Sequence, residues 1–287
     1  MIYTYMYVYK LIMRSPTLTS TLFLASRLHS TSALSTSTCR AARALHLPST
    51  ALRTCALPST TTTTTTAAST TITRPFSASH ARNTSTAMSA TLLEAFKARR
   101  SFYQLNKELP ISTDKITSIV QENLIQAPSS FNSQSNRVLV LYGAEHDKLW
   151  DITSDVLKQI VPADSWEATA QRNAGFKAAA GTVLFFIDTT VVAGMQEKFA
   201  LYKDRFPVWA EHSTAILQYA AWTTLEAEGL GANLQHYNPL IDERVAAEWN
   251  VPAHWQLTAQ LVFGGRAGEP GPKDHLPLEE TFKVAGA

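Results

Sequence analysis

The acidic residues of this chain divide it into two parts. All 23 Asp and Glu residues lie in residues 88–287, whereas residues 1–87 contain none and carry one Lys and seven Arg. The second part has 17 basic residues and therefore a net charge of −6. A domain that binds nucleic acid uses basic charge to neutralise phosphates. The acidic second part therefore argues against a nucleic-acid partner.

Residues 1–87 have the composition of a disordered targeting segment. They hold 34 Ser or Thr, and an Arg-rich segment without acids is typical of a mitochondrial transit peptide. Residues 74–79 (RPFSAS) resemble a mitochondrial processing site, which predicts a mature matrix protein that begins near Thr84. Two alternatives stay open: a low-complexity extension, or translation from Met88 with the protein in the cytoplasm or nucleus.

Both cysteines, Cys39 and Cys55, fall in this N-terminal part. Their absence from residues 88–287 excludes disulfides, thiolate catalysis and iron–sulfur ligation there. The histidines have no ligand-like spacing with carboxylates, so we expect no metal site. The apolar stretch at residues 1–13 is shorter than the ~20 residues that a membrane span needs. We therefore expect no membrane span, and any redox chemistry has to come from a bound cofactor.

The spacing of apolar residues predicts one α+β domain in residues 88–287, with a mixed central sheet flanked by helices. Helices are expected at residues 91–100, 112–126, 145–160 and 211–228, and strands at residues 137–142, 182–187 and 257–263. The strand at 182–187 (TVLFFI) is apolar on both faces, which indicates a central strand covered by helices on each side. The helix at 211–228 is apolar around most of its circumference, as in a core helix or a subunit interface. The three prolines after Gly265 indicate an extended C-terminal arm.

Two polar clusters have the chemistry of a nucleotide-like ligand. Arg99, Arg100 and Ser101 offer guanidinium and hydroxyl donors that suit a phosphate, although basic residues in a last helical turn also complement the helix dipole. Residues 127–134 end in Asn132 and Gln134, whose amides carry donors and acceptors that suit the edge of a planar heterocycle. The alternative for this second cluster is an ordinary polar turn.

Two further clusters follow later in the chain. Residues 229–239 combine glycines, which permit close approach of a flat ligand, with Gln235 and His236; the alternative is a histidine at an element boundary. The last cluster contains Lys273 and His275, which could return to a phosphate or belong to a solvated arm. No Ser/His/Asp arrangement of a hydrolase is present, so no catalytic side chain is expected.

In this order, the clusters resemble the nitroreductase family of flavoproteins. The first is similar to that family's Arg-x-Ser element, the second to its Pro-Ser-Ser-x-Asn-x-Gln loop, and the third to its Gly-Leu-Gly segment. The stretches AEGLGANLQHYNP and AQLVFGGRAGEPGPK resemble more particularly a fungal and bacterial subgroup associated with fatty-acid repression in yeast. The resemblance covers residues 88–287 and none of residues 1–87.

The resemblance implies a homodimeric NAD(P)H oxidoreductase of nitroreductase-like fold, with FMN at the dimer interface. It would reduce nitroaromatic or related small acceptors by ping-pong hydride transfer through the flavin, with NADH or NADPH as donor. By this resemblance, the first cluster would hold the FMN phosphate and ribityl through Arg99, Arg100 and Ser101, and the second would contact the ring edge through Asn132 and Gln134. The third would pack along one ring face with Leu230, Gly231, Gln235 and His236. In the tail, Lys273 and His275 would return to the phosphate. Tyr103 and His275 stand where many members have a basic residue, which leaves the phosphate less neutralised. This permits an alternative, a regulatory or stress-response protein in lipid signalling with little turnover.

The targeting prediction is tested by fusing residues 1–87 to a fluorescent protein. We expect the fusion to colocalise with a mitochondrial marker, because an acid-free cationic segment is driven inward by the membrane potential. A fusion in which the seven arginines are replaced by glutamine is the control and should stay outside. Diffuse cytosolic fluorescence of the unaltered fusion would contradict the prediction.

Overall fold

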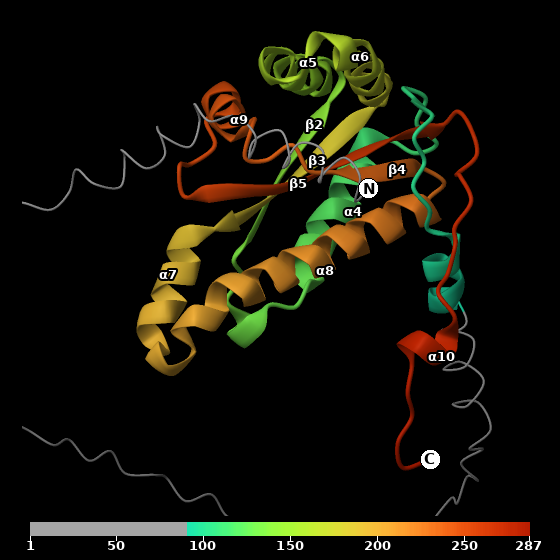
Figure 1. The fold of residues 1–287 in the computed structure, drawn as a ribbon. Helices are drawn as coiled ribbons and strands as arrows, with labels where there is room; N and C mark the ends of the chain where they lie inside the picture. Colours follow the sequence, from blue (N-terminus) through green and yellow to red (C-terminus); the bar gives the residue numbers. More distant parts are fainter. Residues whose placement is uncertain (1–90) are drawn as a thin grey trace, which may run out of the picture. The chain divides into compact units, whose positions relative to one another are not determined.

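In residues 91–287, which the computed structural model describes, five strands form one sheet (Figure 1). The strands are β1 (Leu105–Asn106), β2 (Asn136–Tyr142), β3 (Gly181–Asp188), β4 (Gly231–Gln235) and β5 (Trp255–Arg266). β5 pairs with β3 along one edge and with β4 and β1 along the other, and β2 pairs with the outer edge of β3. These ladders are antiparallel, and an isolated bridge between Ser101 and Ala232 adds a parallel contact. The predictions for residues 1–87 lie outside the described residues.

Helices cover both faces of the sheet (Figure 1). One face is covered by α4 (Thr113–Gln126) and α8 (Phe206–Ala227), and the other by α5 (Gly143–Ile160), α6 (Ala163–Lys177) and α9 (Asp242–Trp249). After β3 the chain continues through α7 (Thr189–Lys198) and the short 3-10 segment η2 (Ala200–Arg205) into α8. Residues 91–98 are helical as well, and their Phe96 ring lies 5.5 Å from the ring of Tyr219 on α8.

Strand β3 shows why the sheet needs cover on both faces. All eight of its residues are buried, and successive side chains of a strand point to opposite faces. Val183 and Phe185 belong to the core cluster that contains α4 and α8, whereas Leu184 and Phe186 belong to the cluster that contains α5 and α6. This confirms the prediction of a central strand, and with it the α+β arrangement of helices around a central sheet.

The predicted helices and strands are present, with shifted ends. The largest shift is at α8, which begins at Phe206 and so includes Pro207 in its first turn. Proline is well tolerated there, because the first N–H groups of a helix have no partner inside the helix. Sequence reasoning missed α6, α7, α9, β1 and β4. Helix α6 buries only Asn173 and Phe176, so its apolar periodicity is too weak to detect.

The C-terminal arm leaves the sheet at the end of β5. It is exposed along most of its length and contains one short helix, α10 (Leu278–Thr281). The start of the arm is tied to the segment after the first helix, since the Ala267 N–H donates to the Gln104 carbonyl over 2.9 Å. The predicted extended arm is confirmed. Within residues 91–287, no helix combines the length and the apolar character that crossing a membrane requires.

Candidate functional site

The first cluster lies beside β4, at the C-terminal end of α8. The Phe102 N–H donates to the Ala232 carbonyl over 2.9 Å, and the Asn233 side chain donates to the Phe102 carbonyl over 2.7 Å. The Gln235 amide donates in turn to Asn233 Oδ1 over 2.8 Å. The fold therefore brings the Arg99–Ser101 cluster and the cluster at residues 229–239 together, as the resemblance implies.

A buried carboxylate holds the first cluster in place. Glu226, in the last turn of α8, accepts hydrogen bonds from the Arg100 N–H over 2.9 Å and from the Trp222 indole over 2.6 Å. The Arg99 guanidinium lies 4.4 Å from the centre of the Trp222 ring. Burial raises the pKa of Glu226, while these hydrogen bonds and the charges of Arg266 and Arg99 act against that rise. Sequence reasoning missed Glu226, although an acid that follows a long apolar helical run is a usable signal.

Arg266 has a structural role at the same end of α8. Its guanidinium donates to the main-chain carbonyls of Leu230 and Glu226, each over 3.0 Å, and lies 4.4 Å from the centre of the Phe102 ring. These carbonyls belong to the end of a helix and the turn after it, where carbonyl groups lack helical partners. Arg266 therefore closes the turn between α8 and β4, and its donors are directed into the protein.

Two residues of the third cluster are explained by packing. Leu230 is fully buried in the core cluster that contains α4 and α8, and its implied place along one flavin face stays a prediction. A Cβ on Gly231 would lie 2.7 Å from Leu105 Cδ2 and 3.0 Å from Phe102 Cβ. Glycine is needed there because Phe102 and Leu105 pack closely on β4. Gln235 is half-buried and His236 is exposed, so both remain accessible.

The two cationic candidates of the tail lie in the exposed arm. Lys273 and His275 are both exposed. The Arg100 guanidinium donates to the Gly271 carbonyl, so the arm passes the first cluster two residues before Lys273. Tyr103, two residues after Ser101, is exposed as well. The contact between Arg100 and Gly271 brings the arm to the first cluster at the end of α8.

The second cluster, residues 127–134, is called the amide loop after the side chains of Asn132 and Gln134, and its backbone is strained. Phe131, Asn132 and Gln134 have φ angles of 56°, 51° and 52°, in the left-handed region that non-glycine residues rarely adopt. The Ser129 hydroxyl accepts from the Gln134 N–H over 2.8 Å and helps to hold this conformation. The side chains of Asn132 and Gln134 are exposed, and within residues 91–287 their amides make no hydrogen bonds. Such strain is usually retained where it presents a functional group.

Aromatic side chains fix the other side of this loop. The Phe131 ring lies 4.8 Å from that of Phe199, 5.6 Å from that of Phe206 and 5.9 Å from that of Trp209, measured between ring centres. Phe206 and Trp209 form the first turn of α8. The amide loop is thereby attached to the N-terminal end of α8.

The two halves of the candidate site thus lie at opposite ends of one helix. The amide loop contacts Phe206, whereas the Arg99–Ser101 segment contacts Glu226. With a rise of 1.5 Å per residue, these two positions are about 30 Å apart along the helix axis. One chain therefore does not bring its phosphate-suited and ring-suited groups onto a single flavin mononucleotide.

The chemistry of the two halves nevertheless fits FMN. At one end, cationic and hydroxyl donors gather on a segment whose backbone is fixed by Glu226. At the other end, two exposed amides without partners in the described residues offer the donors and acceptors that a flavin ring edge requires.

Comparison with known proteins identifies the family of the chain. Residues 96–265 match the nitroreductase family, and the chain belongs to that family. HBN1 of Saccharomyces cerevisiae, a nitroreductase by name, is 38% identical over 189 residues, which cover 65% of this chain and 94% of HBN1. The family is that of flavin-type oxidoreductases. The link to fatty-acid repression stays a prediction.

Solved structures show the same fold. The nitroreductase CinD from Lactococcus lactis, in complex with nicotinic acid, is 45% identical with a TM-score of 0.63, and the match covers 68% of this chain and 99% of CinD. Structures of CinD with chloramphenicol and with 4-nitrophenol match at 44% identity. A nitroreductase from Desulfitobacterium hafniense with bound FMN shares the fold at 18% identity and a TM-score of 0.51, covering 67% of this chain and 97% of its own.

The role of Glu226 is tested by Glu226→Ala. The change leaves the Arg100 N–H and the Trp222 indole without their acceptor in a buried place, so the free energy of unfolding should fall by about 2–4 kcal/mol. Glu228→Ala is the matched control. Glu228 is exposed and lies 4.0 Å from Lys115, so its loss should change stability by less than about 0.5 kcal/mol. Urea denaturation measures both, and equal losses would contradict the anchoring role.

Proposed function

We propose that this chain is an FMN-dependent NAD(P)H oxidoreductase that reduces nitroaromatic or related small electron acceptors. The observation that carries the proposal is the pairing of a cationic segment anchored by Glu226 with a strained loop that exposes two amides, in a member of the nitroreductase family. When bound, FMN supplies the hydride chemistry in two alternating half-reactions, from the nicotinamide and then to the acceptor. The protein binds, orients and shields the reactants.

We assign the phosphate to the C-terminal end of α8, beside the Arg99–Ser101 cluster. Arg99, Ser101 and Lys273 would hold it, with Arg100 fixing the arm through the Gly271 carbonyl. Charge-assisted hydrogen bonds of this kind contribute roughly 1.5–3 kcal/mol each. Glu226 is a buried carboxylate at the same end of α8, and the positive charges of Arg266 and Arg99 act on it. Asn132 and Gln134 would form hydrogen bonds with the edge of the flavin ring.

In a homodimer, the two separated halves of the site could bind one FMN if each half came from a different chain. The outer surface formed by residues 91–98 and α8 exposes a band of apolar side chains: Leu92, Leu93, Phe96, Val208, Ile216 and Tyr219. Exposed apolar side chains of this kind favour an interface. If two copies pair across a two-fold axis near the middle of α8, the N-terminal end of one helix meets the C-terminal end of the other. The amide loop of one chain then faces the Arg99–Ser101 segment of the second chain.

The acceptor class is supported by the aromatic surroundings of the amide loop. Phe131 and Tyr202 are exposed beside Phe199 and Trp209, and aromatic faces favour offset stacking on a planar aromatic ring. The related CinD has been solved with 4-nitrophenol and with chloramphenicol. Small nitroaromatic compounds therefore agree with both the surface and the relative.

The proposal is tested by the visible spectrum and turnover of the purified protein. We expect yellow protein, or uptake of one FMN per chain on titration, and oxidation of NADH or NADPH that accelerates when a nitroaromatic acceptor is added. Riboflavin, which lacks the phosphate, should bind at least tenfold more weakly, because it loses the charge-assisted bonds. Protein that takes up no FMN would contradict the proposal, and bound FMN without turnover would favour the regulatory alternative.

A further inference from the structure

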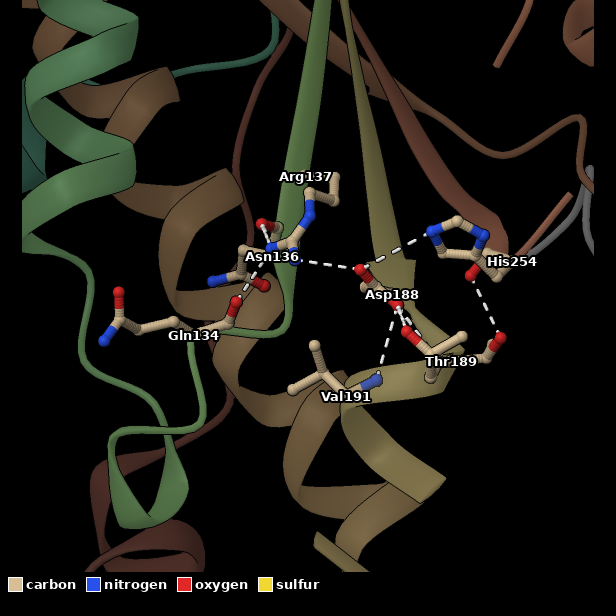
Figure 2. Close-up of polar contacts among 8 residues, drawn as sticks. Gln134, Asn136, Arg137, Asp188, Thr189, Val191 and His254 are labelled. Carbon is tan, nitrogen blue, oxygen red and sulfur yellow. Dashed lines mark hydrogen bonds and ion pairs between the residues drawn. The ribbon is translucent and has the colours of Figure 1, made fainter. Parts of the chain in front are cut away.

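An arginine at the start of β2 joins three parts of the chain (Figure 2). Arg137 Nη1 donates to the main-chain carbonyls of Gln134 and Asn136, each over 2.8 Å. Its Nη2 donates to Asp188 Oδ2, also over 2.8 Å. Asp188 is the last residue of β3 and lies 51 residues further along the chain. One guanidinium thus ties the end of the amide loop to the end of the central strand.

Asp188 is itself held by several groups. Its Oδ1 accepts from the N–H groups of Thr190 and Val191 over 3.0 and 3.3 Å, and these two bonds cap α7. The same oxygen accepts from the Thr190 hydroxyl over 2.6 Å. Its own N–H donates to the Ser135 carbonyl over 2.8 Å. Burial alone would raise the pKa of Asp188, but these hydrogen bonds and the charge of Arg137 lower it below its ordinary value. The carboxylate is therefore ionised at neutral pH and remains paired with Arg137.

Two residues from β5 and the turn before it complete the surroundings of this pair. The Arg137 guanidinium lies 5.8 Å from the centre of the Trp255 ring. His254 Nε2 lies 3.8 Å from Asp188 Oδ2, and the His254 carbonyl accepts from both the N–H and the hydroxyl of Thr189. Because β5, β3 and β2 all contribute, the pair is fixed to the rigid sheet and not to other loops.

The pair reaches the candidate ring site through one main-chain carbonyl. In Figure 2 the carbonyl of Gln134 faces Arg137, whereas its side-chain amide points away from the pair. The left-handed backbone of Gln134 needs restraint, and it has restraint on both sides: Ser129 Oγ holds the N–H and Arg137 holds the carbonyl. The side-chain amide is thereby directed outward from a fixed backbone.

We propose that Arg137 and Asp188 are positioning residues, which hold the amide loop in the conformation that reads the flavin ring edge without touching the ligand. The inference rests on the proposed function for the identity of the ligand. The planar fork of arginine spans acceptors on two sides at once, whereas the compact ammonium of lysine reaches fewer of them. A site whose supporting residues are loosened places its ligand-binding groups less accurately and binds more weakly.

The first experiment measures flavin binding by the full-length Arg137→Lys and Asp188→Asn variants. We expect the Kd values for FMN and for riboflavin to rise by the same factor, about tenfold, because the ring is common to both ligands. The reduction potential of the bound flavin should shift as well, since hydrogen bonds to the ring tune it. The matched control is Arg244→Lys, in the exposed pair with Asp155 at 3.4 Å, which should leave Kd and potential unchanged.

The second experiment measures hydrogen exchange of the flavin-free protein and needs no ligand. The N–H groups of Asn132, Ser133 and Gln134 are bonded within the loop, so both variants should speed their exchange at least fivefold while exchange in α8 stays unchanged. Faster exchange in the loop of both variants, together with the expected rise in Kd, supports the inference.

The outcomes separate the two proposals. Wild-type protein that binds FMN, together with variants of unchanged Kd, potential and loop exchange, overturns the positioning role and leaves the proposed function standing. A loss confined to FMN, with riboflavin binding unaffected, also overturns it, because the pair would then act on the phosphate. If the wild-type protein takes up no flavin, the proposed function fails, and the positioning role fails with it.

Discussion

Helix α8 sets the geometry on which the candidate site depends. It is a continuous rod of 22 residues, and its hydrogen-bonded backbone keeps its two ends about 30 Å apart. The amide loop packs on its first turn through Phe131, and the Arg99–Ser101 segment is bonded to its last turn through Glu226. Neither group can approach the other within one chain. The proposed two-fold pairing turns this separation into two equivalent sites, each with one half from either chain.

Different physical devices hold the two ends. At the C-terminal end, a buried carboxylate satisfies a main-chain N–H and an indole and is surrounded by arginines, so charge and hydrogen bonding fix the backbone. At the N-terminal end, a loop with three left-handed residues is held by aromatic packing on one side and by Arg137 on the other. Both arrangements leave polar side chains accessible beside a rigid framework, which suits recognition of a cofactor that brings its own chemistry.

Local patterns in the sequence were sufficient to predict much of this fold. The run TVLFFI identifies β3 because it is apolar on both faces, and the order of the motifs points to the two clusters of candidate residues. Other features depend on contacts that are distant in sequence. The burial of Leu230 could not be predicted, because a core leucine and a ligand-contacting leucine look alike in one sequence. Arg137 was missed because its partner Asp188 is 51 residues away, and the 30 Å separation of the halves follows from tertiary structure alone.

Subunit complementation tests the divided site most directly. Arg99→Ala and Asn132→Ala variants are purified separately, unfolded, mixed in equal amounts and refolded, and NAD(P)H oxidation with a nitroaromatic acceptor is compared with that of each variant. In a dimer with shared sites, half of the random pairs are mixed and each mixed pair regains one intact site, so the mixture should recover about one quarter of wild-type activity. A mixture no more active than the two variants alone would contradict the account, because both halves would then act within a single chain.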